Sequence, residues 1–413
     1  MKAKVGVVSL GCPRNLVDSE NIAGRLALKG YKIVDIADAD IGLVNTCAFI
    51  ESAKRESVDA ILDLIELKKQ GKLKKIIVHG CLAQRYKEEL KKHLCEVDAF
   101  VGVLKFSPAA KKFRLTPAHY RYLKICEGCV NNCSYCIIPS IKGKFKSLSQ
   151  EYLLKQVGEF NKAKIAELNI IGQDITGYGV DIYRRQCLAG LLKQIVKRAG
   201  NIRWIRLLYL NPERLNDELI GLIRDQAKIC KYVDLPVQHI NSRLLKLMRR
   251  SSGSEQIIGL IERIRKEIPG VCLRTSVIVG FPSETEKEFA QLLDFIREVK
   301  FQRLGAFTYS REEGTSAYHL TGQLPEKIKQ ERFARVMSVQ QQVSELNNRK
   351  LLGSRLEVLI EDQQNGAYLG RTQSDAPEVD GLVYVKSDKK LSAGDFVKVR
   401  ITDTLEYDLV GEI

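Results

Sequence analysis

The chain has 413 residues, which is too long for one hydrophobic core and predicts two or three domains. Hydrophobic residues make up 45% and charged residues 28%, as in soluble globular proteins, and no apolar run approaches the ~20 residues that cross a bilayer. The N-terminal residues also lack a signal-peptide pattern, so we expect no membrane association and a cytoplasmic location, where the 11 cysteines serve as metal ligands or free thiols.

The net charge of +16 is unevenly distributed along the chain. Residues 350–413 contain eight Lys or Arg and twelve Asp or Glu, a local balance of −4, so residues 1–349 carry about +20. A basic body favours nucleic acid, because neutralised phosphates release counterions, although a single basic stretch usually only keeps a surface soluble. The acidic tail instead favours a basic partner.

In the first region, about residues 1–115, an apolar run rich in β-branched residues ends in a cysteine three times, at Cys12, Cys47 and Cys81. Amphipathic helical stretches over 15–30 and 51–71 follow the first two runs, each closed by a glycine. Strands that alternate with helices predict a parallel sheet, whose carboxyl strand ends lie along one edge. We therefore expect the three thiolates to converge there; the alternative is that each cysteine merely fills a strand end.

The second region, about residues 116–345, predicts six strands with helices between them. The strands fall at 121–126, 167–172, 204–209, 232–238, 274–280 and 303–309. One helix is expected over 213–227 after the pair Asn211-Pro212, and another is opened by Ser283 and Glu286 as a capping box. Successive β-α units with right-handed crossovers predict a partial (β/α)6 barrel.

Cys129, Cys133 and Cys136 follow the first of these strands with the spacing C-x3-C-x2-C. Three thiolates so close in sequence can hold three irons of a cubic iron–sulfur cluster and leave the fourth iron open. A non-enzymatic metal- or RNA-binding protein with structural zinc would need four ligands per site, whereas the chain offers two sets of three cysteines and five histidines overall. The other cysteines lack a pattern and are expected to be structural: Cys95, Cys126, Cys187, Cys230 and Cys272.

The third region, about residues 346–413, contains five short alternating runs. They fall at 354–361, 367–372, 382–385, 396–402 and 406–413, and turn residues separate them at 364–366 and 393–395. Together they predict a small antiparallel barrel of the oligonucleotide-binding kind. The fold class is thus α/β for the first two regions, with a β-barrel at the end.

The whole chain resembles the radical S-adenosylmethionine (SAM) methylthiotransferases. Their signature is C-x3-C-x2-C after a first barrel strand, three more cysteines in an N-terminal domain, and a C-terminal TRAM barrel. The segments SLGCPRNLVDSE, VNTCAFIESAKRESVDAI, HGCLAQRY, DLPVQHI and GRTQSDAPEVDGLVYV are similar to the branch that modifies an aspartate of ribosomal protein S12. One departure is Ala48, where the family often has glycine; this exchange of one small residue for another puts little in doubt.

The resemblance implies two [4Fe–4S] clusters with different roles. Cys129, Cys133 and Cys136 would bind one cluster, whose open iron chelates SAM and whose reduction yields methionine and a 5′-deoxyadenosyl radical. The N-terminal cysteines would bind an auxiliary cluster whose open iron carries the sulfur, supplied as sulfide or by another sulfur donor. One SAM methylates that sulfur, and a second serves to abstract hydrogen from the aspartate β-carbon of S12. A low-potential electron donor, such as flavodoxin or ferredoxin, is implied as a further partner.

The resemblance also implies contacts to SAM. Residues Gly172, Gln173 and Asp174 would meet its amino-acid end, and Gln238 would lie near the ribose. Gly280 would belong to the segment that passes the adenine, and Tyr135 would offer a backbone contact. The alternatives are that Gly280 only makes a turn and that Gln238 only ends a strand, while His239 is expected to be structural.

The competing enzyme is a tRNA (adenosine) methylthiotransferase, which belongs to the sister branch. The basic body would suit RNA, but the acidic tail barrel suits a Lys- and Arg-rich ribosomal protein better. The barrel also lacks obvious aromatic stacking pairs, apart from the isolated Tyr368 and Tyr384. We therefore expect tRNA to be the less suitable substrate.

Overall fold

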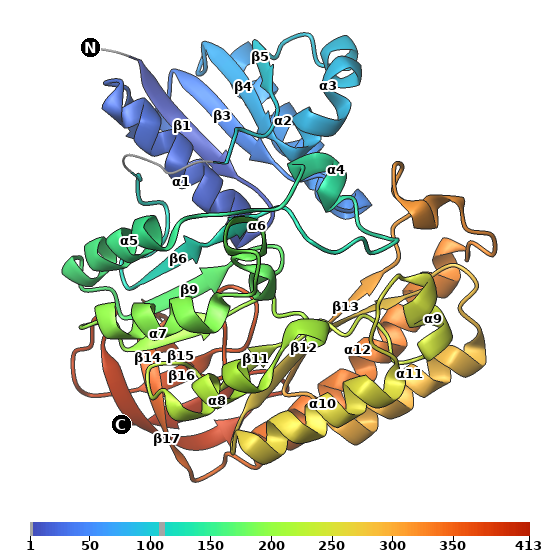
Figure 1. The fold of residues 1–413 in the computed structure, drawn as a ribbon. Coiled ribbons are helices and arrows are strands. Elements are labelled where there is room, and N and C mark those ends of the chain that lie inside the picture. Colours follow the sequence, from blue (N-terminus) through green and yellow to red (C-terminus); the bar gives the residue numbers. More distant parts are fainter. Residues whose placement is uncertain (1–2, 107–111) are drawn as a thin grey trace.

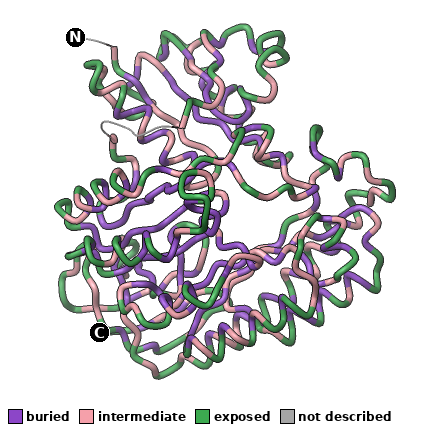
Figure 2. The backbone as a smooth tube through the Cα atoms, in the orientation of Figure 1, coloured by how far each residue is buried: buried purple, intermediate pink, exposed green. Residues whose placement is uncertain are grey.

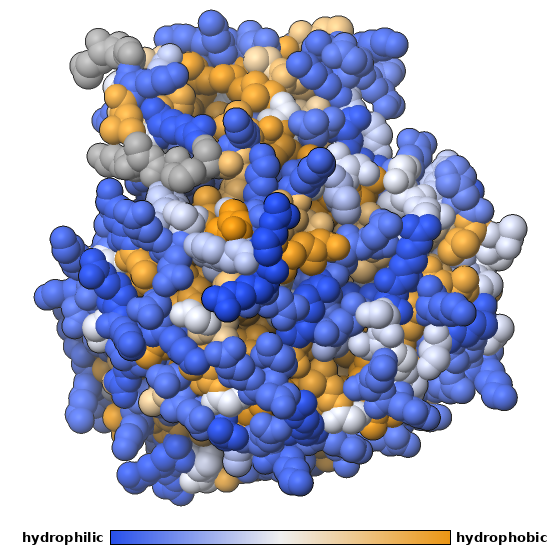
Figure 3. Space-filling model, in the orientation of Figure 1, coloured by the Kyte–Doolittle hydropathy of each residue, from blue (hydrophilic) through white to orange (hydrophobic). Residues whose placement is uncertain are grey.

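The computed structural model describes residues 3–106 and 112–413 as three packed regions. The N-terminal region lies at the top of Figure 1 and the C-terminal barrel at the lower left, with the central region between them. Buried residues follow the sheets of these regions (Figure 2), while the face seen in Figure 3 is covered mainly by hydrophilic residues. Among the described helices, none is both long and apolar enough to span a bilayer.

The N-terminal region is a five-stranded parallel sheet with the order β2-β1-β3-β4-β5. The three expected strands form its centre, and two short strands that the sequence pattern did not reveal extend it at both edges. Its elements are β1 (Lys4–Ser9), α1 (Pro13–Leu28), β2 (Lys32–Val34), η1 (Ile36–Asp38), β3 (Ile41–Thr46), α2 (Glu51–Lys69), β4 (Lys75–Gly80), α3 (Cys81–His93) and β5 (Ala99–Val101).

The central region has the six expected parallel strands, in two three-stranded sheets ordered β6-β9-β10 and β11-β12-β13. The segment before β11 joins them, because Ile205 pairs in parallel with Ile229. The predicted partial barrel is therefore confirmed. Its elements are β6 (Tyr120–Lys124), β7 (Cys126–Glu127), α4 (Ile138–Lys142), β8 (Lys146–Ser147), α5 (Gln150–Lys162), β9 (Glu167–Ile171), η2 (Ile175–Gly177), α6 (Val180–Tyr183), α7 (Leu188–Arg198), β10 (Trp204–Leu207), η3 (Pro212–Arg214), α8 (Asp217–Asp225), β11 (Tyr232–Asp234), α9 (Ser242–Leu247), α10 (Ser254–Glu267), β12 (Cys272–Val279), α11 (Glu286–Val299), β13 (Arg303–Thr308), η4 (Ser316–His319) and α12 (Glu326–Arg349).

Two helix starts differ from the prediction. The expected helix over 213–227 is only the short η3 followed by α8, whose N-cap is Asn216, with its side chain accepting from the Leu219 amide. The capping box of α11 is formed by Thr285 and Glu288 instead of Ser283 and Glu286. Ser283 has φ +62°, whereas an N-cap residue needs extended backbone, so the predicted box is wrong by two positions.

The third region is a closed five-stranded barrel ordered β14-β15-β16-β18-β17. Most pairs are antiparallel as predicted, but β16 and β18 run parallel. The turn at Asn365-Gly366 is the expected two-residue hairpin loop, with φ of 49° and 83°. Its strands are β14 (Arg355–Gln364), β15 (Ala367–Thr372), β16 (Val383–Lys386), β17 (Phe396–Thr404) and β18 (Leu409–Glu412).

The loop between β15 and β16 docks this barrel against the amino ends of the central strands. Asp375 pairs with Arg303 at the start of β13 (2.5 Å), and Asp380 contacts Arg274 of β12 (3.4 Å). Ala376 from the same loop is fully buried in a cluster with aromatic residues of the central strands. The terminal barrel therefore lies at the end of the central barrel opposite to the carboxyl strand ends.

Candidate active site

Cys12, Cys47 and Cys81 lie just beyond the carboxyl ends of three neighbouring strands. Cys12 is the N-cap of α1, Cys47 directly follows β3, and Cys81 is the first residue of α3. Because β1, β3 and β4 are adjacent, the three residues share one edge of the sheet. The loop before Cys12 packs closely against Cys47, because a Cβ added to Gly11 would lie 2.8 Å from Cys47 Cβ.

Buried polar side chains hold the loops that carry these cysteines, and none of them was expected from the sequence. Asn45 Nδ2 donates to the Asn15 carbonyl (2.8 Å), and Asn15 Nδ2 donates to the Thr46 carbonyl (3.2 Å). Ser57 Oγ accepts from the Cys47 amide and donates to its carbonyl, both at 2.9 Å. One hint of these contacts is present in the sequence: Asn45 is an amide side chain near the end of an apolar strand, where a buried polar group needs hydrogen-bond partners.

The three thiols differ in their electrostatic surroundings. Burial raises the pKa of Cys47 and raises that of Cys81 to about 12. Burial opposes ionisation of Cys12 as well, but the Arg14 guanidinium, with Nε 3.3 Å from the sulfur, brings the pKa of Cys12 below its ordinary value. Thiolates are the form that binds iron, so loading this site with metal must release protons.

Cys129, Cys133 and Cys136 lie on the loop between β7 and α4, across the carboxyl end of the central barrel. The loop is fixed from both sides: the Ser134 amide donates to the Met248 carbonyl after α9 (3.1 Å), and the Ala317 amide of η4 donates to the Ser134 carbonyl (2.8 Å). These contacts connect the loop to segments that follow β11 and β13. The cysteine loop is therefore held at the rim where parallel barrels keep their ligand sites.

The surroundings of this triplet combine burial with a few hydrogen-bond donors. Burial raises the pKa of Cys129 and raises that of Cys136 to about 12. Asn131 donates to Cys129 Sγ from its amide (3.4 Å) and from Nδ2 (3.3 Å). Within residues 3–106 and 112–413, no three His, Cys, Asp or Glu side chains are gathered as a single ion would require. A cubic cluster makes a different demand, because each cysteine binds a separate iron.

The segment 172–174 follows β9 beside this loop. A Cβ on Gly172 would lie 2.5 Å from Cys126 Sγ, so only glycine fits there. Gln173 Nε2 donates to Glu127 (2.5 Å), while Gln173 Oε1 is buried without a hydrogen-bond partner among the described residues. An acceptor left in that state fits a ligand donor such as the ammonium group of SAM.

The Asp174 carboxylate is already engaged by protein side chains instead of being free to bind a ligand. Its carboxylate accepts from Asn131 and Arg214, both at 2.8 Å, and from Asn211 at 3.3 Å. Asp174 thus ties the cysteine loop to the end of β10. The contact predicted between Asp174 and SAM stays a prediction.

The remaining predicted contacts follow β11 and β12. Gln238 has φ +69° and links the two strand ends through its backbone, with its amide donating to the Ser276 carbonyl (2.9 Å). Gly280 has φ +74°, and a Cβ there would overlap Lys329 of α12, so close helix packing already requires glycine. Tyr135 packs in a cluster with Phe281 and other apolar residues.

His239 uses both ring nitrogens within the protein, as a structural histidine would. Nε2 contacts Glu284 (3.1 Å), and Nδ1 accepts from the Asn241 amide (3.0 Å). Of the five cysteines without a pattern, Cys95 is exposed. The other four are buried or half-buried: Cys126, Cys187, Cys230 and Cys272.

A buried group of four charges joins the N-terminal and central regions. Lys124 of β6 pairs with Asp18 of α1 and with Glu127 (2.5 Å), and Lys142 of α4 pairs with the same two carboxylates at 3.1 and 3.5 Å. Each lysine contacts both carboxylates, so the charges compensate one another in a site shielded from water. The cluster fixes α1, whose N-cap is Cys12, against α4, the helix that follows Cys136.

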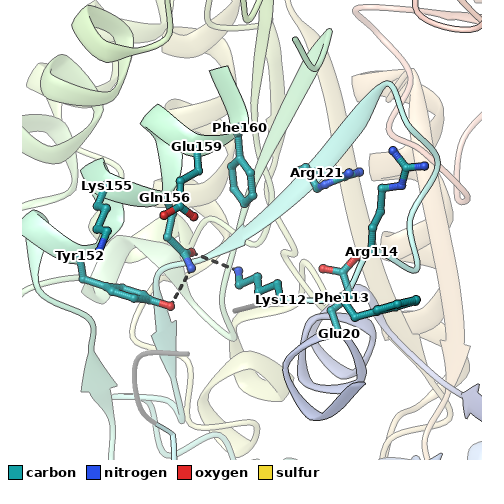
Figure 4. Close-up of a pocket in the computed structure, with 10 residues that line it drawn as sticks. All are labelled: Glu20, Lys112, Phe113, Arg114, Arg121, Tyr152, Lys155, Gln156, Glu159 and Phe160. Atoms are coloured by element: carbon teal, nitrogen blue, oxygen red, sulfur yellow. Dashed lines mark hydrogen bonds between the residues drawn. The ribbon is translucent and has the colours of Figure 1, made fainter. Parts of the chain in front are cut away.

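Two surface hollows lie near these regions. One, of about 440 Å³, is lined by residues that include Glu20, Lys112, Gln156 and Phe160 (Figure 4), and none of the six cysteines lines it. A second, of about 670 Å³, runs between α2, α3 and the segment before η4, and its lining includes Glu51. The second hollow lies beside α2, which follows Cys47, and α3, which begins at Cys81.

The fold and the cysteine loop define a radical SAM protein. Residues 123–296 match the radical SAM superfamily, residues 352–413 match the TRAM domain, and residues 4–102 match the uncharacterized protein family UPF0004. Membership of the radical SAM superfamily implies SAM and a [4Fe–4S] cluster as cofactors.

Similar proteins cover almost the entire chain. The ribosomal protein uS12 methylthiotransferase RimO of Clostridioides difficile (strain 630) is 46% identical, over 99% of this chain and 98% of the relative. The RimO protein of Thermoanaerobacter sp. (strain X514) is 45% identical over 99% of both chains, and that of Geobacter sulfurreducens is 44% identical over 100% and 99%. The chain belongs to this family of ribosomal protein uS12 methylthiotransferases.

Solved structures share the fold at low sequence identity. The radical SAM methyltransferase TsrM from Kitasatospora setae superposes with a TM-score of 0.56, 14% identity, and coverage of 89% of this chain and 81% of the other. The cobalamin-dependent SAM radical enzyme OxsB gives a TM-score of 0.51 at 13% identity, with coverage of 83% and 56%. These similarities establish the fold alone.

Proposed function

We propose that the protein adds a methylthio group to the β-carbon of an aspartate in ribosomal protein S12. The observation that carries this proposal is the 44–46% identity, over nearly the full length, to ribosomal protein uS12 methylthiotransferases. An aliphatic C–H bond beside a carboxylate is too weakly acidic for a side-chain base, so radical chemistry is the suitable route.

Two cysteine sets would hold two [4Fe–4S] clusters. Cys129, Cys133 and Cys136 would bind the cluster that holds SAM, and the N-terminal set of Cys12, Cys47 and Cys81 would bind the auxiliary cluster that carries the sulfur. Support comes from their placement: each set lies at the carboxyl ends of parallel strands, and α1 with its buried charge cluster fixes the two regions to each other. Sulfide or another sulfur donor, and a reductant of the flavodoxin or ferredoxin kind, would complete the system.

The protein's own contribution is binding, orientation and exclusion of water. Bound SAM and its cluster supply a methyl group and the means to remove hydrogen from an unactivated carbon. Gln173 Oε1, buried and without a partner among the described residues, would accept from the SAM ammonium group. The Gly172 backbone, Gln238, Gly280, Tyr135 and Asp174 remain proposed neighbours of SAM, with Asp174 acting through the cysteine loop that it anchors.

Part of the acidic charge of the terminal barrel is neutralised inside the protein. Asp375, Asp380 and Glu361 pair with arginines, and Glu378 accepts from the Tyr120 hydroxyl at 2.7 Å. This pairing weakens the argument from charge for a basic protein substrate. The preference for S12 over tRNA therefore depends on the family relationship, and the cytoplasmic location stays a prediction.

The decisive experiment presents both substrates to the same enzyme. Anaerobically reconstituted protein with SAM, sulfide and a low-potential reductant should add a methylthio mass to purified S12, detected by mass spectrometry. Iron and acid-labile sulfide should each reach about eight per chain, as expected for two cubic clusters. Modification of tRNA with S12 left unchanged would contradict the proposal.

Cysteine variants separate the two proposed roles. The triple change of Cys129, Cys133 and Cys136 to Ala should leave about four irons and abolish SAM cleavage. The matched triple change of Cys12, Cys47 and Cys81 to Ala should also leave about four irons, but it should retain SAM cleavage while losing sulfur insertion. Identical behaviour of the two variants would contradict this division.

A further inference from the structure

Arg14 bridges the two parts of the candidate active site. It lies in the first turn of α1, two residues after Cys12, and its Nε donates to Cys12 Sγ at 3.3 Å. Its Nη1 donates to the carbonyl of Gly172, at the end of β9, at 3.1 Å. The guanidinium also lies over the Tyr209 ring, 4.5 Å from its centre. Two hydrogen bonds and a ring contact therefore hold this cation in one orientation.

The cation lies between the two cysteine sets. Its Nε contacts Cys12 of the N-terminal set, and its Nη1 contacts Gly172, which lies against Cys126 at the start of the segment that carries the triplet. Any reaction that draws on both sets must place the substrate carbon in the space between them. Arg14 is therefore in the right place to contact a substrate.

Arg14 differs from the neighbouring cations because no carboxylate of the described residues lies within ion-pair distance of it, and Glu127 acts on its charge only from farther away. Lys124 and Lys142 share Asp18 and Glu127, and Arg214 pairs with Asp174 at 2.8 Å. Within the described parts of the chain, Arg14 forms no ion pair, and its Nη2 has no hydrogen-bond partner. Both Nη2 hydrogens and one Nη1 hydrogen are therefore available as donors, and a guanidinium binds a carboxylate through such hydrogens.

We infer that Arg14 binds the side-chain carboxylate of the substrate aspartate and so determines specificity for it. This inference depends on the proposed function, because it takes the acceptor to be an aspartate of S12. The carboxylate is bonded directly to the β-carbon that receives the sulfur, so a fixed guanidinium on the carboxylate fixes the reacting carbon. Arg14 thereby selects an anionic residue and orients it between the two cysteine sets.

The test compares S12 with an S12 variant whose target aspartate is asparagine, a neutral side chain of the same shape. Reconstituted wild-type enzyme should bind fluorescently labelled S12 about 10-fold or more tightly than the asparagine form, as expected for loss of a charge-assisted hydrogen bond. Arg14→Gln should weaken binding of the aspartate form to the level of the asparagine form and leave binding of the asparagine form unchanged. Arg14→Lys should recover part of the preference.

Arg55→Gln is the matched control, since it removes the same charge from an exposed site on α2 whose side chain is 77% exposed. It should leave the aspartate-to-asparagine ratio at the wild-type value. Iron content and SAM binding of Arg14→Gln are measured beside those of the wild type, because Arg14 also contacts Cys12 and Gly172.

Two results would overturn the inference. One is an equal loss of affinity for both S12 forms in Arg14→Gln, and the other is loss of iron or SAM binding with the preference for aspartate retained. Wild-type turnover of S12 reports the proposed function separately. If the wild type modifies S12 and Arg14→Gln keeps the preference, only the role of Arg14 fails; if the wild type leaves S12 unmodified, the proposed function itself fails.

Discussion

Replacing Arg371 with Met should destabilise the junction between the terminal and central barrels. Arg371 is 1% exposed, and its Nη2 donates to Glu167 (2.6 Å) and Glu361 (2.7 Å) while Nη1 donates to the Asp375 carbonyl (2.7 Å). Glu167 is fully buried, and its other oxygen accepts from Arg206 at 2.7 Å. The substitution therefore leaves a buried carboxylate with one of its two cations.

The expected loss follows from these contacts. Breaking a buried ion pair by removal of one partner costs about 3–5 kcal/mol, because the remaining charge stays in a site that water does not reach. Arg206 still neutralises Glu167, and the Met side chain recovers some apolar packing, so we expect a value near the lower limit. The free energy of unfolding should fall by about 3 kcal/mol.

The single tryptophan of the chain gives a local readout. Trp204 opens β10 and meets the Phe396 ring of the terminal barrel edge to face, with ring centres 4.9 Å apart. Urea unfolding at neutral pH, followed by tryptophan fluorescence, should therefore report this junction. Arg355→Met, at an exposed position on β14, is the control and should cost less than about 0.5 kcal/mol. A loss below about 1 kcal/mol for Arg371→Met would refute the reasoning.

Three further outcomes test separate parts of the structure. Burial opposes ionisation of Glu361, but hydrogen bonds from its histidine and arginine partners hold its pKa at about 2. The ionised carboxylate therefore contributes fully to the free energy of unfolding above pH ~4.3, and this contribution is lost as the pH falls toward 2. Thermal unfolding of Glu361→Gln should therefore depend less on pH over this range than that of the wild type, and equal slopes would contradict the assignment. Gly172→Ala should lower the free energy of unfolding by about 1–3 kcal/mol and weaken SAM binding, because the added Cβ meets Cys126 Sγ. The double variant with Cys126→Ala should restore stability in an unfolding assay and affinity in a SAM-binding assay. Thr285→Val should lower the free energy of unfolding by about 1 kcal/mol because it removes the N-cap of α11, whereas Ser283→Ala should lower it less. A larger loss for Ser283→Ala would instead support the capping box predicted from the sequence.

The amino-acid sequence by itself determined the order of elements and the position of each cysteine relative to a strand end. Short apolar runs rich in β-branched residues that end at Cys12 and Cys47 mark strands, and a parallel sheet brings their carboxyl ends to one edge. Helix starts were less predictable. Ser283 and Thr285 are equivalent in residue type, and only the backbone, with φ +62° at Ser283, decides which of them can cap α11.

Only the tertiary structure decided which charges neutralise one another. Glu167 and Arg371 are 204 positions apart, and no local pattern connects them, yet their contact closes the amino end of the central barrel. Two carboxylates of the acidic tail, those of Asp375 and Asp380, pair with arginines of the central region and are therefore not free for a partner. Arg14 lies two residues after a candidate ligand in the sequence, but its contact with the segment after β9, from Nη1 to the Gly172 carbonyl at 3.1 Å, exists only in the folded chain. Local periodicity specifies elements, whereas the pairing of buried charges depends on long-range packing.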